Sequence, residues 1–186
     1  MKRYEIRLAG SGGQGLILAG IILAEAAGVH DGKFVCQTQS YGPEARGGAS
    51  KAEVVISDEE IDYPQVIEPD LLLCMNQRSC EAYAFDLKPD GLLVVDASFV
   101  HDILTTRAVS LPFTKIAREE VGREQTANIV ALGALAVLSG VVSLASLKTA
   151  VLARIPPGTG ELNEKALDAG IAAARGYLEE KAGKSQ

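Results

Sequence analysis

Residues 10–15 read Gly-Ser-Gly-Gly-Gln-Gly, and this short run decides the fold. Before it, residues 4–8 alternate polar and apolar side chains, which is the pattern of a β-strand. After it, residues 16–29 are rich in Ala and Leu and apolar all round, as in a buried helix. A strand, a glycine-rich turn and a helix in this order predict the first unit of an α/β domain, with the N-terminal amides of the helix facing the turn.

The rest of the chain continues this alternation of strands and helices. Continuous apolar runs at residues 71–75 and 92–95 predict strands that are covered on both faces. Strands separated by helices favour a mostly parallel sheet. The sequence therefore predicts a single-domain, Rossmann-like three-layer α/β sandwich over residues 1–182, with a flexible tail at 183–186. We expect further strands at 34–38, 52–56 and 107–111, a loop at 42–48, a turn-rich connector at 64–69, and helices at 79–85, 113–121, 127–138, 144–153 and 163–180.

The overall charge bears on the class of partner. The 186 residues carry a formal net charge of −6, and the pI is near 5.0. Nonspecific binding to nucleic acid or to an anionic membrane needs a basic face, so we expect neither partner. The N-terminus has no apolar segment with a cleavage site, and we expect a cytoplasmic protein. The apolar stretch 129–147 is interrupted by Gly133, Ser139 and Gly140, which favours a buried helix pair over a membrane span.

The three cysteines give no sign of a metal site. Cys36, Cys74 and Cys80 lie in apolar segments, and their spacing matches no zinc or iron–sulfur pattern. His30 and His101 have no evident partners in the sequence. We therefore expect reduced core thiols and no metal held by this chain.

The glycine run satisfies the Gly-x-Gly-x-x-Gly spacing of dinucleotide-binding proteins, but its usual partner is missing. That fingerprint places an Asp or Glu at the end of the second strand, where it holds a ribose. Here the strand ends Gln37-Thr38-Gln39-Ser40, while Asp31 comes too early and Glu44 lies inside the next loop. NAD or FAD binding is therefore the weaker alternative. A tight turn without any ligand also stays open, although four glycines exceed what a turn needs.

A second glycine-rich segment, residues 40–50, follows the second strand. In a parallel sheet it should lie at the same carboxyl edge as the first turn, where ligands usually bind. Arg46 precedes two glycines, so its guanidinium could take a phosphate or a carboxylate. Glu44 and Arg46 could instead pair with each other or with a neighbouring subunit. Tyr41 could stack on a ring or cover the core. Asn76 and Gln77 should reach this edge too.

Another polar residue, Asn128, enters an apolar helix, where a structural role is more common than ligand binding. No Ser–His–Asp set and no recognisable pair of acid and base can be assembled from the sequence. Nothing in this chain is expected to perform chemistry alone. Three classes of function stay open at this point: a subunit of a catalytic complex, an autonomous dinucleotide-binding oxidoreductase, and a non-catalytic interaction module whose glycine loops merely turn the chain.

The two loops together resemble those of a known family. Gly-Ser-Gly-Gly-Gln-Gly at 10–15 and Ser-Tyr-Gly-Pro-Glu-Ala-Arg-Gly-Gly at 40–48 are similar to the gamma subunits of 2-oxoacid:ferredoxin oxidoreductases. The strand ending before Asn76 and the helix start at 126–129 fit as well. The similarity covers nearly the whole chain, and the pair of motifs is more specific than either motif alone.

The resemblance implies an oxidoreductase complex that decarboxylates a 2-oxoacid, passes electrons through iron–sulfur clusters to ferredoxin, and forms an acyl-CoA. It places thiamine diphosphate between alpha and beta subunits and the clusters in cysteine-rich partner chains, with a delta subunit left open. The gamma chain is implied to serve assembly and to contact coenzyme A (CoA), holding no cofactor alone. The amino-acid sequence of the second loop is closer to the 2-oxoglutarate and branched-chain types than to the pyruvate type, and 2-oxoglutarate is favoured as the substrate.

The resemblance also implies site residues for the CoA contact, while no catalytic residue is assigned. Those of the first turn would approach the pyrophosphate or the pantetheine arm, and those of the second loop would join them. The residues are Gly10, Ser11, Gly12, Gly13 and Gln14 from the turn, Ser40, Tyr41, Glu44 and Arg46 from the loop, and Asn128 as a further polar contact.

Overall fold

A computed structural model describes residues 2–41, 49–103 and 108–184. In these ranges the chain forms one six-stranded sheet with the strand order β2-β3-β1-β4-β5-β6. The predicted mixed α/β fold with a mostly parallel sheet is confirmed. The strands are β1 (Tyr4–Ser11), β2 (Phe34–Tyr41), β3 (Ala49–Ser57), β4 (Leu71–Cys74), β5 (Leu92–Asp96) and β6 (Val109–Leu111).

The helices also lie where the sequence predicts them, with ends shifted by a few residues. The two apolar segments of 129–147 form two separate helices, α4 and α5, and in the described part of the chain no helix is both long and apolar enough to cross a membrane. The main helices are α1 (Leu16–Glu25), α2 (Gln77–Tyr83), α3 (Phe113–Ile116), α4 (Ala127–Ser139), α5 (Leu144–Arg154) and α6 (Gly160–Gly183). Short helical turns are η1 (Ala26–His30), η2 (Ala84–Asp86), η3 (Ala117–Val121) and η4 (Glu124–Thr126).

One strand runs against the others. β1, β4, β5 and β6 are parallel neighbours, whereas β3 pairs antiparallel with both β1 and β2. Only residues 42–48 separate β2 from β3, and parallel neighbours need a longer crossover connection, so the two strands pair antiparallel. β3 therefore lies between β2 and β1. In a fully parallel sheet, β2 would be the neighbour of β1. It still points in the same direction as β1, and both end at one edge of the sheet.

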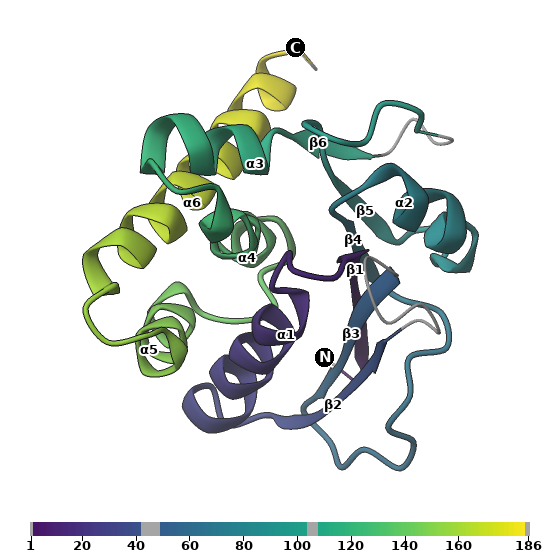
Figure 1. The fold of residues 1–186 in the computed structure, drawn as a ribbon. Coiled ribbons are helices and arrows are strands. Elements are labelled where there is room, and N and C mark those ends of the chain that lie inside the picture. The colour runs from purple at the N-terminus through teal and green to yellow at the C-terminus, as the bar shows by residue number, and fades with distance from the viewer. Residues whose placement is uncertain (1, 42–48, 104–107, 185–186) are drawn as a thin grey trace.

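The two faces of the sheet are covered unequally, as Figure 1 shows. α1, α3, α4, α5 and α6 lie on one face, where the larger core gathers around side chains such as Leu8, Val54 and Leu73. On the other face lies α2, over a smaller core of Leu72, Cys74 and others. The third layer of the predicted sandwich is thus a thin one.

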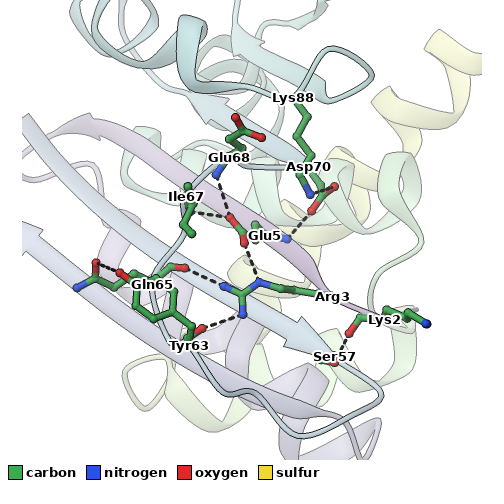
Figure 2. Close-up of polar contacts among 10 residues, drawn as sticks. All are labelled: Lys2, Arg3, Glu5, Ser57, Tyr63, Gln65, Ile67, Glu68, Asp70 and Lys88. Carbon is green, nitrogen blue, oxygen red and sulfur yellow. Dashed lines mark hydrogen bonds and ion pairs between the residues drawn. The ribbon is translucent and has the colours of Figure 1, made fainter.

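Polar contacts fix the connector between β3 and β4 against the start of β1 (Figure 2). The Arg3 guanidinium donates to the carbonyl oxygens of Tyr63 and Gln65 at 2.7 and 2.8 Å. The buried Glu5 carboxylate accepts from the backbone N–H groups of Ile67 and Glu68 at 2.7 and 3.1 Å and pairs with Arg3 at 2.7 Å. This network lies at the amino edge of the sheet, opposite the glycine turn, so its role is structural.

A carboxylate ties the end of η1 to the start of α5. Asp31 accepts from the backbone N–H of Ser143 at 2.8 Å and from the hydroxyls of Ser143 and Ser146 at 2.9 and 2.6 Å. Burial acts to raise the pKa of Asp31, but the hydrogen bonds from Ser146 and Ser143 and the nearby Lys33 outweigh it and hold that pKa below its ordinary value.

We expect Asp31→Ala to lower the free energy of unfolding by about 2 kcal/mol at neutral pH, because three donors lose a charged acceptor. Since the pKa is lower in the folded than in the unfolded state, the contribution is present above the ordinary carboxyl pKa and is lost as pH falls through the folded-state value. Urea unfolding of both proteins at neutral pH and below about pH 4 measures this. An equal difference at both pH values would contradict it.

Candidate functional site

The carboxyl edge of the sheet brings together three of the predicted segments. Ser11 at the end of β1 is in register with Ala49, and Tyr41 at the end of β2 is in register with Ser50. Asn76, two residues after the end of β4, donates from its side-chain amide to the Ser11 hydroxyl at 2.5 Å. The first turn, the end of the second strand and Asn76 therefore meet at one edge, as the sequence predicts.

Three of the four glycines in the turn are explained by the fold itself. Gly13 and Gly15 have φ angles of +92° and +70°, a region that side-chain-bearing residues rarely adopt. A Cβ on Gly10 would lie 2.7 Å from Cδ1 of Leu16. Gly12 differs, because it is exposed, its φ is not positive, and a Cβ there would meet no atom within 4 Å. The fold therefore does not require glycine at position 12.

The Gln14 side chain closes the turn, and both its oxygen and its nitrogen bond within the protein. Its Oε1 accepts from the Ser11 N–H at 2.7 Å, and its Nε2 donates to the Met75 carbonyl at 3.0 Å. The Gln14 N–H also donates to the Ser11 carbonyl at 3.2 Å. This fixes the turn against β4 and leaves the Gln14 amide oriented inward, which favours a structural role.

Asn128 is likewise used to hold the turn. This residue is buried, and its Nδ2 donates to the Gly15 carbonyl at 3.0 Å, across more than a hundred residues of sequence. It lines a pocket of about 210 Å³ together with Gly15, Arg123 and residues of the α5–α6 connection. The structure therefore places Asn128 behind the turn, where it holds the Gly15 carbonyl.

A different pocket, of about 200 Å³, opens directly beside the turn. Gly13 and Gln14 form one wall, and the buried Met75 and Ala127 are also part of its lining. The remaining lining residues come from segments that the sequence analysis did not single out. They are Phe99 from the turn after β5, Thr114 from α3, and Glu124 and Gln125 from η4.

Asp96, at the end of β5, fixes two walls of this pocket. Its fully buried carboxylate accepts from the Ser98 N–H at 3.0 Å and from the N–H and hydroxyl of Thr114. The Phe99 N–H donates to the Asp96 carbonyl at 3.0 Å. An acid that follows a predicted strand is the one sequence signal for this wall, because its Thr114 partner lies 18 residues away.

The other predicted residues are placed as follows. Ser40 is exposed near the end of β2, and Tyr41 ends that strand. Glu44 and Arg46 lie outside the described residues, so their part in a site stays a prediction. The start of α1 has neither a side-chain cap nor an acidic residue in its first turn.

The dinucleotide alternative loses support from the topology. In a dinucleotide-binding domain the second parallel strand lies beside the first and carries the ribose-binding acid at its end. Here the antiparallel β3 occupies that place, and its edge residues Ala49 and Ser50 carry no acid.

The cysteines are free thiols and form no metal site. Within residues 2–41, 49–103 and 108–184, no three His, Cys, Asp or Glu side chains are grouped to hold a metal ion. Cys74 of β4 and Cys80 of α2 are buried in the same small core cluster. A hydrogen bond with Cys74 lowers the pKa of Cys80 to about 7, and the same pairing, together with burial, raises the pKa of Cys74.

Comparison with known proteins identifies the family. Residues 5–173 match the family model described as pyruvate ferredoxin/flavodoxin oxidoreductase. The chain belongs to this family. Among its relatives, the 2-oxoglutarate synthase subunit KorC of Methanocaldococcus jannaschii is 50% identical over 177 residues, which are 93% of this chain and 95% of the relative.

Solved structures agree with this membership of the pyruvate ferredoxin/flavodoxin oxidoreductase family. The keto/oxoacid ferredoxin oxidoreductase gamma subunit from Geobacter sulfurreducens superposes with a TM-score of 0.87 at 48% identity, over 95% of this chain and 98% of that one. The 2-oxoglutarate:ferredoxin oxidoreductase from Magnetococcus marinus, solved with 2-oxoglutarate, coenzyme A and succinyl-CoA bound, gives a TM-score of 0.82 at 27% identity, over 95% of this chain and 32% of that chain. The resemblance to gamma subunits of 2-oxoacid:ferredoxin oxidoreductases is confirmed.

Proposed function

We propose that this chain is the gamma subunit of a 2-oxoglutarate:ferredoxin oxidoreductase, which converts 2-oxoglutarate and CoA to succinyl-CoA and CO₂ while two electrons pass to ferredoxin. The observation that carries the choice of substrate is the 50% identity to a 2-oxoglutarate synthase subunit over 95% of that subunit's length. The Magnetococcus marinus enzyme was solved with the same oxoacid and with CoA bound, which supports the choice. The closeness of the second loop to the 2-oxoglutarate and branched-chain types agrees with it.

The chain's own contribution is proposed to be assembly and a contact with CoA. Gly12 is open to solvent, and the uncapped start of α1 favours a negatively charged group such as a pyrophosphate. Ser40, Tyr41, Glu44 and Arg46 would join from the second loop. Because Gln14 and Asn128 bond within the protein, we propose that they stabilise the turn and do not bind CoA.

The electron-transfer cofactors are assigned to partner chains. A [4Fe–4S] cluster needs four cysteine thiolates, and the whole sequence contains three cysteines, so the chain does not supply the ligands of one cluster. We therefore propose alpha and beta subunits that hold thiamine diphosphate and the clusters, with a delta subunit left open, and ferredoxin as the acceptor. In the Magnetococcus marinus relative, the region similar to this chain is about a third of one longer chain, which supports a close association with other parts of the enzyme.

Two other functions are weaker. An autonomous NAD- or FAD-dependent oxidoreductase lacks the ribose-binding acid, and β3 occupies the place of the strand that would carry it. A non-catalytic interaction module explains Gly10, Gly13 and Gly15 as turn residues, but the match to an oxidoreductase family over residues 5–173 disfavours it.

Turnover with a panel of oxoacids tests the proposed substrate. The complex is purified from its own cells and assayed with 2-oxoglutarate, pyruvate and 2-oxoisovalerate, each with CoA and ferredoxin. We expect 2-oxoglutarate to give the highest kcat/KM, with succinyl-CoA as the product. A higher kcat/KM for pyruvate would contradict the substrate, and turnover independent of CoA would contradict the reaction.

A further inference from the structure

We propose that Cys74 and Cys80 form a redox-active pair, which a hydroperoxide converts into a disulfide between β4 and α2. Cys74 ends β4, and Cys80 follows it in the chain as part of α2. Both residues are free thiols, and their side chains are in hydrogen-bond contact. The pair lies in the smaller core on the α2 face of the sheet, so this inference does not depend on the proposed function.

The fold pairs Cys74 with Cys80 and not with Cys36. Cys74 and Cys80 are 0% and 2% exposed and belong to one small core cluster. Cys36 lies on β2, and both β3 and β1 separate that strand from β4. Neighbouring strands are about 4.8 Å apart, so three spacings put β2 about 14 Å from β4. The Cα atoms of a disulfide are usually only about 4.4–6.8 Å apart, which makes Cys80 the partner of Cys74.

The two thiols have different roles, and Cys80 is the one that reacts first. The hydrogen bond from the Cys74 thiol lowers the pKa of Cys80 to about 7. Since the thiolate is the nucleophile, this contact makes Cys80 the more reactive sulfur. The same hydrogen bond, together with burial, raises the pKa of Cys74. Cys74 therefore keeps its proton until the second step.

The reaction takes two steps and needs only the hydroperoxide as oxidant. The Cys80 thiolate attacks one oxygen of the hydroperoxide, an S–O bond forms, the O–O bond breaks, and the departing alkoxide takes up the proton that Cys80 released. The Cys74 sulfur then attacks the Cys80 sulfenic acid, an S–S bond forms, the S–O bond breaks, and the hydroxyl leaves as water with the proton of Cys74. In sum, the two thiols lose two electrons, and the hydroperoxide is reduced to an alcohol and water.

The helix that covers the two thiols is short. α2 spans seven residues and lies over the smaller core, with Arg78 and Glu81 exposed on its outer side (Figure 1). Elements with few buried contacts open locally at a low free-energy cost. Local opening of this single helix gives a small hydroperoxide access to Cys80.

The disulfide also acts on the carboxyl edge of the sheet, through Asn76. This residue lies between the two cysteines and caps α2, because its Oδ1 accepts from the Ser79 N–H at 2.8 Å. Its Nδ2 donates to the Ser11 hydroxyl at the end of β1. Bringing the two sulfurs from hydrogen-bond contact to a covalent bond draws α2 toward β4. Oxidation of the pair is thereby coupled to the position of Asn76.

Peptide mapping tests the pair. The chain is purified with its thiols reduced, treated with hydrogen peroxide, labelled with N-ethylmaleimide in urea and digested with trypsin without reductant. Trypsin cuts after Lys51, Arg78 and Arg107 but not before Pro89, so Cys74 and Cys80 fall on separate peptides, 52–78 and 79–107. We expect these two peptides to be joined, with loss of the N-ethylmaleimide label from both cysteines together. Dithiothreitol should restore both labels.

Three variants test the partner and the order of the steps. Cys36→Ser is the matched control and should give the same joined peptides. In Cys74→Ala the Cys80 sulfenic acid has no neighbouring thiol, so dimedone should label peptide 79–107 after peroxide treatment. In Cys80→Ala dimedone should leave peptide 52–78 unlabelled.

The contrary results are equally distinct. Wild-type cysteines that both keep their N-ethylmaleimide label after peroxide treatment would overturn the pair. Sulfinic acid on Cys80 beside a free Cys74 thiol would overturn it too, because the second step would then not occur. Joined peptides that disappear in Cys36→Ser would show exchange from Cys36 and would also overturn the direct reaction. A dimedone label on peptide 52–78 in Cys80→Ala would overturn the assignment of Cys80 as the first thiol to react.

Discussion

Replacing Gly170 by alanine should lower the free energy of unfolding by about 3 kcal/mol, the upper part of the range for overpacking a well-packed core. Gly170 lies in α6 where this helix crosses α4, and a Cβ there would overlap the Val130 carbonyl group. The contact is between one backbone and another, so no side-chain rotation can relieve it. Gly133 makes the reciprocal approach, from α4 to the Leu167 carbonyl of α6.

Urea and thermal unfolding of the purified chain measure this effect, which corresponds to a fall in Tm of about 6–12 °C. Gly176→Ala is the matched control, because Gly176 lies in the same helix with no atom within 4 Å of its added Cβ. That variant should be stabilised by about 0.5–1 kcal/mol through helix propensity. Equal stability of the two variants would contradict close packing of α4 against α6.

Replacing Gly12 by valine should lower kcat/KM for CoA by about 100-fold in the assembled complex, while the chain stays folded. The expectation follows from the contrast within the turn. Gly10, Gly13 and Gly15 are needed by the fold, but Gly12 has open space around it and no positive φ. A branched side chain at this place therefore costs the fold little and displaces a ligand that approaches the backbone.

Steady-state kinetics with CoA varied, together with circular dichroism and Tm, separate the two effects. Gly176→Val tests whether the same substitution at another open glycine affects the kinetics, and it should not. Full activity of Gly12→Val would refute a close approach of CoA to the turn. A loss of folding in Gly12→Val would instead show that the turn needs glycine at this position.

Most of the fold follows from the hydrophobic pattern. The apolar runs that form β4 and β5, and the apolar segments that form α1 and α4, are strong signals because burial on all sides leaves few polar residues among them. The direction of β3 does not follow from the same pattern. Two strands separated by a short loop predict an antiparallel hairpin. The glycine-rich segment at residues 40–50 is instead interpreted from the sequence as a ligand loop of a parallel sheet.

The site is predictable only in part, for a related reason. Ser11 and Asn76 each follow a strand, so the topology alone brings them together. The bonds that Gln14 and Asn128 make to backbone groups at the turn are not predicted, because a sequence does not reveal which polar group a side chain will reach. Their contact with a ligand stays a prediction. Phe99 and Thr114 carry no motif, and the buried Asp96 that unites them acts through tertiary contacts.

Affinity purification of the tagged chain from its own cells tests the central claim most directly, with mass spectrometry of the partners and assays for thiamine diphosphate and iron. We predict recovery of a complex in which this chain is accompanied by thiamine-diphosphate-binding and iron–sulfur subunits. A protein recovered alone, retaining NAD or FAD and lacking iron, would contradict the assignment as an oxidoreductase subunit and would favour an autonomous dinucleotide-binding enzyme.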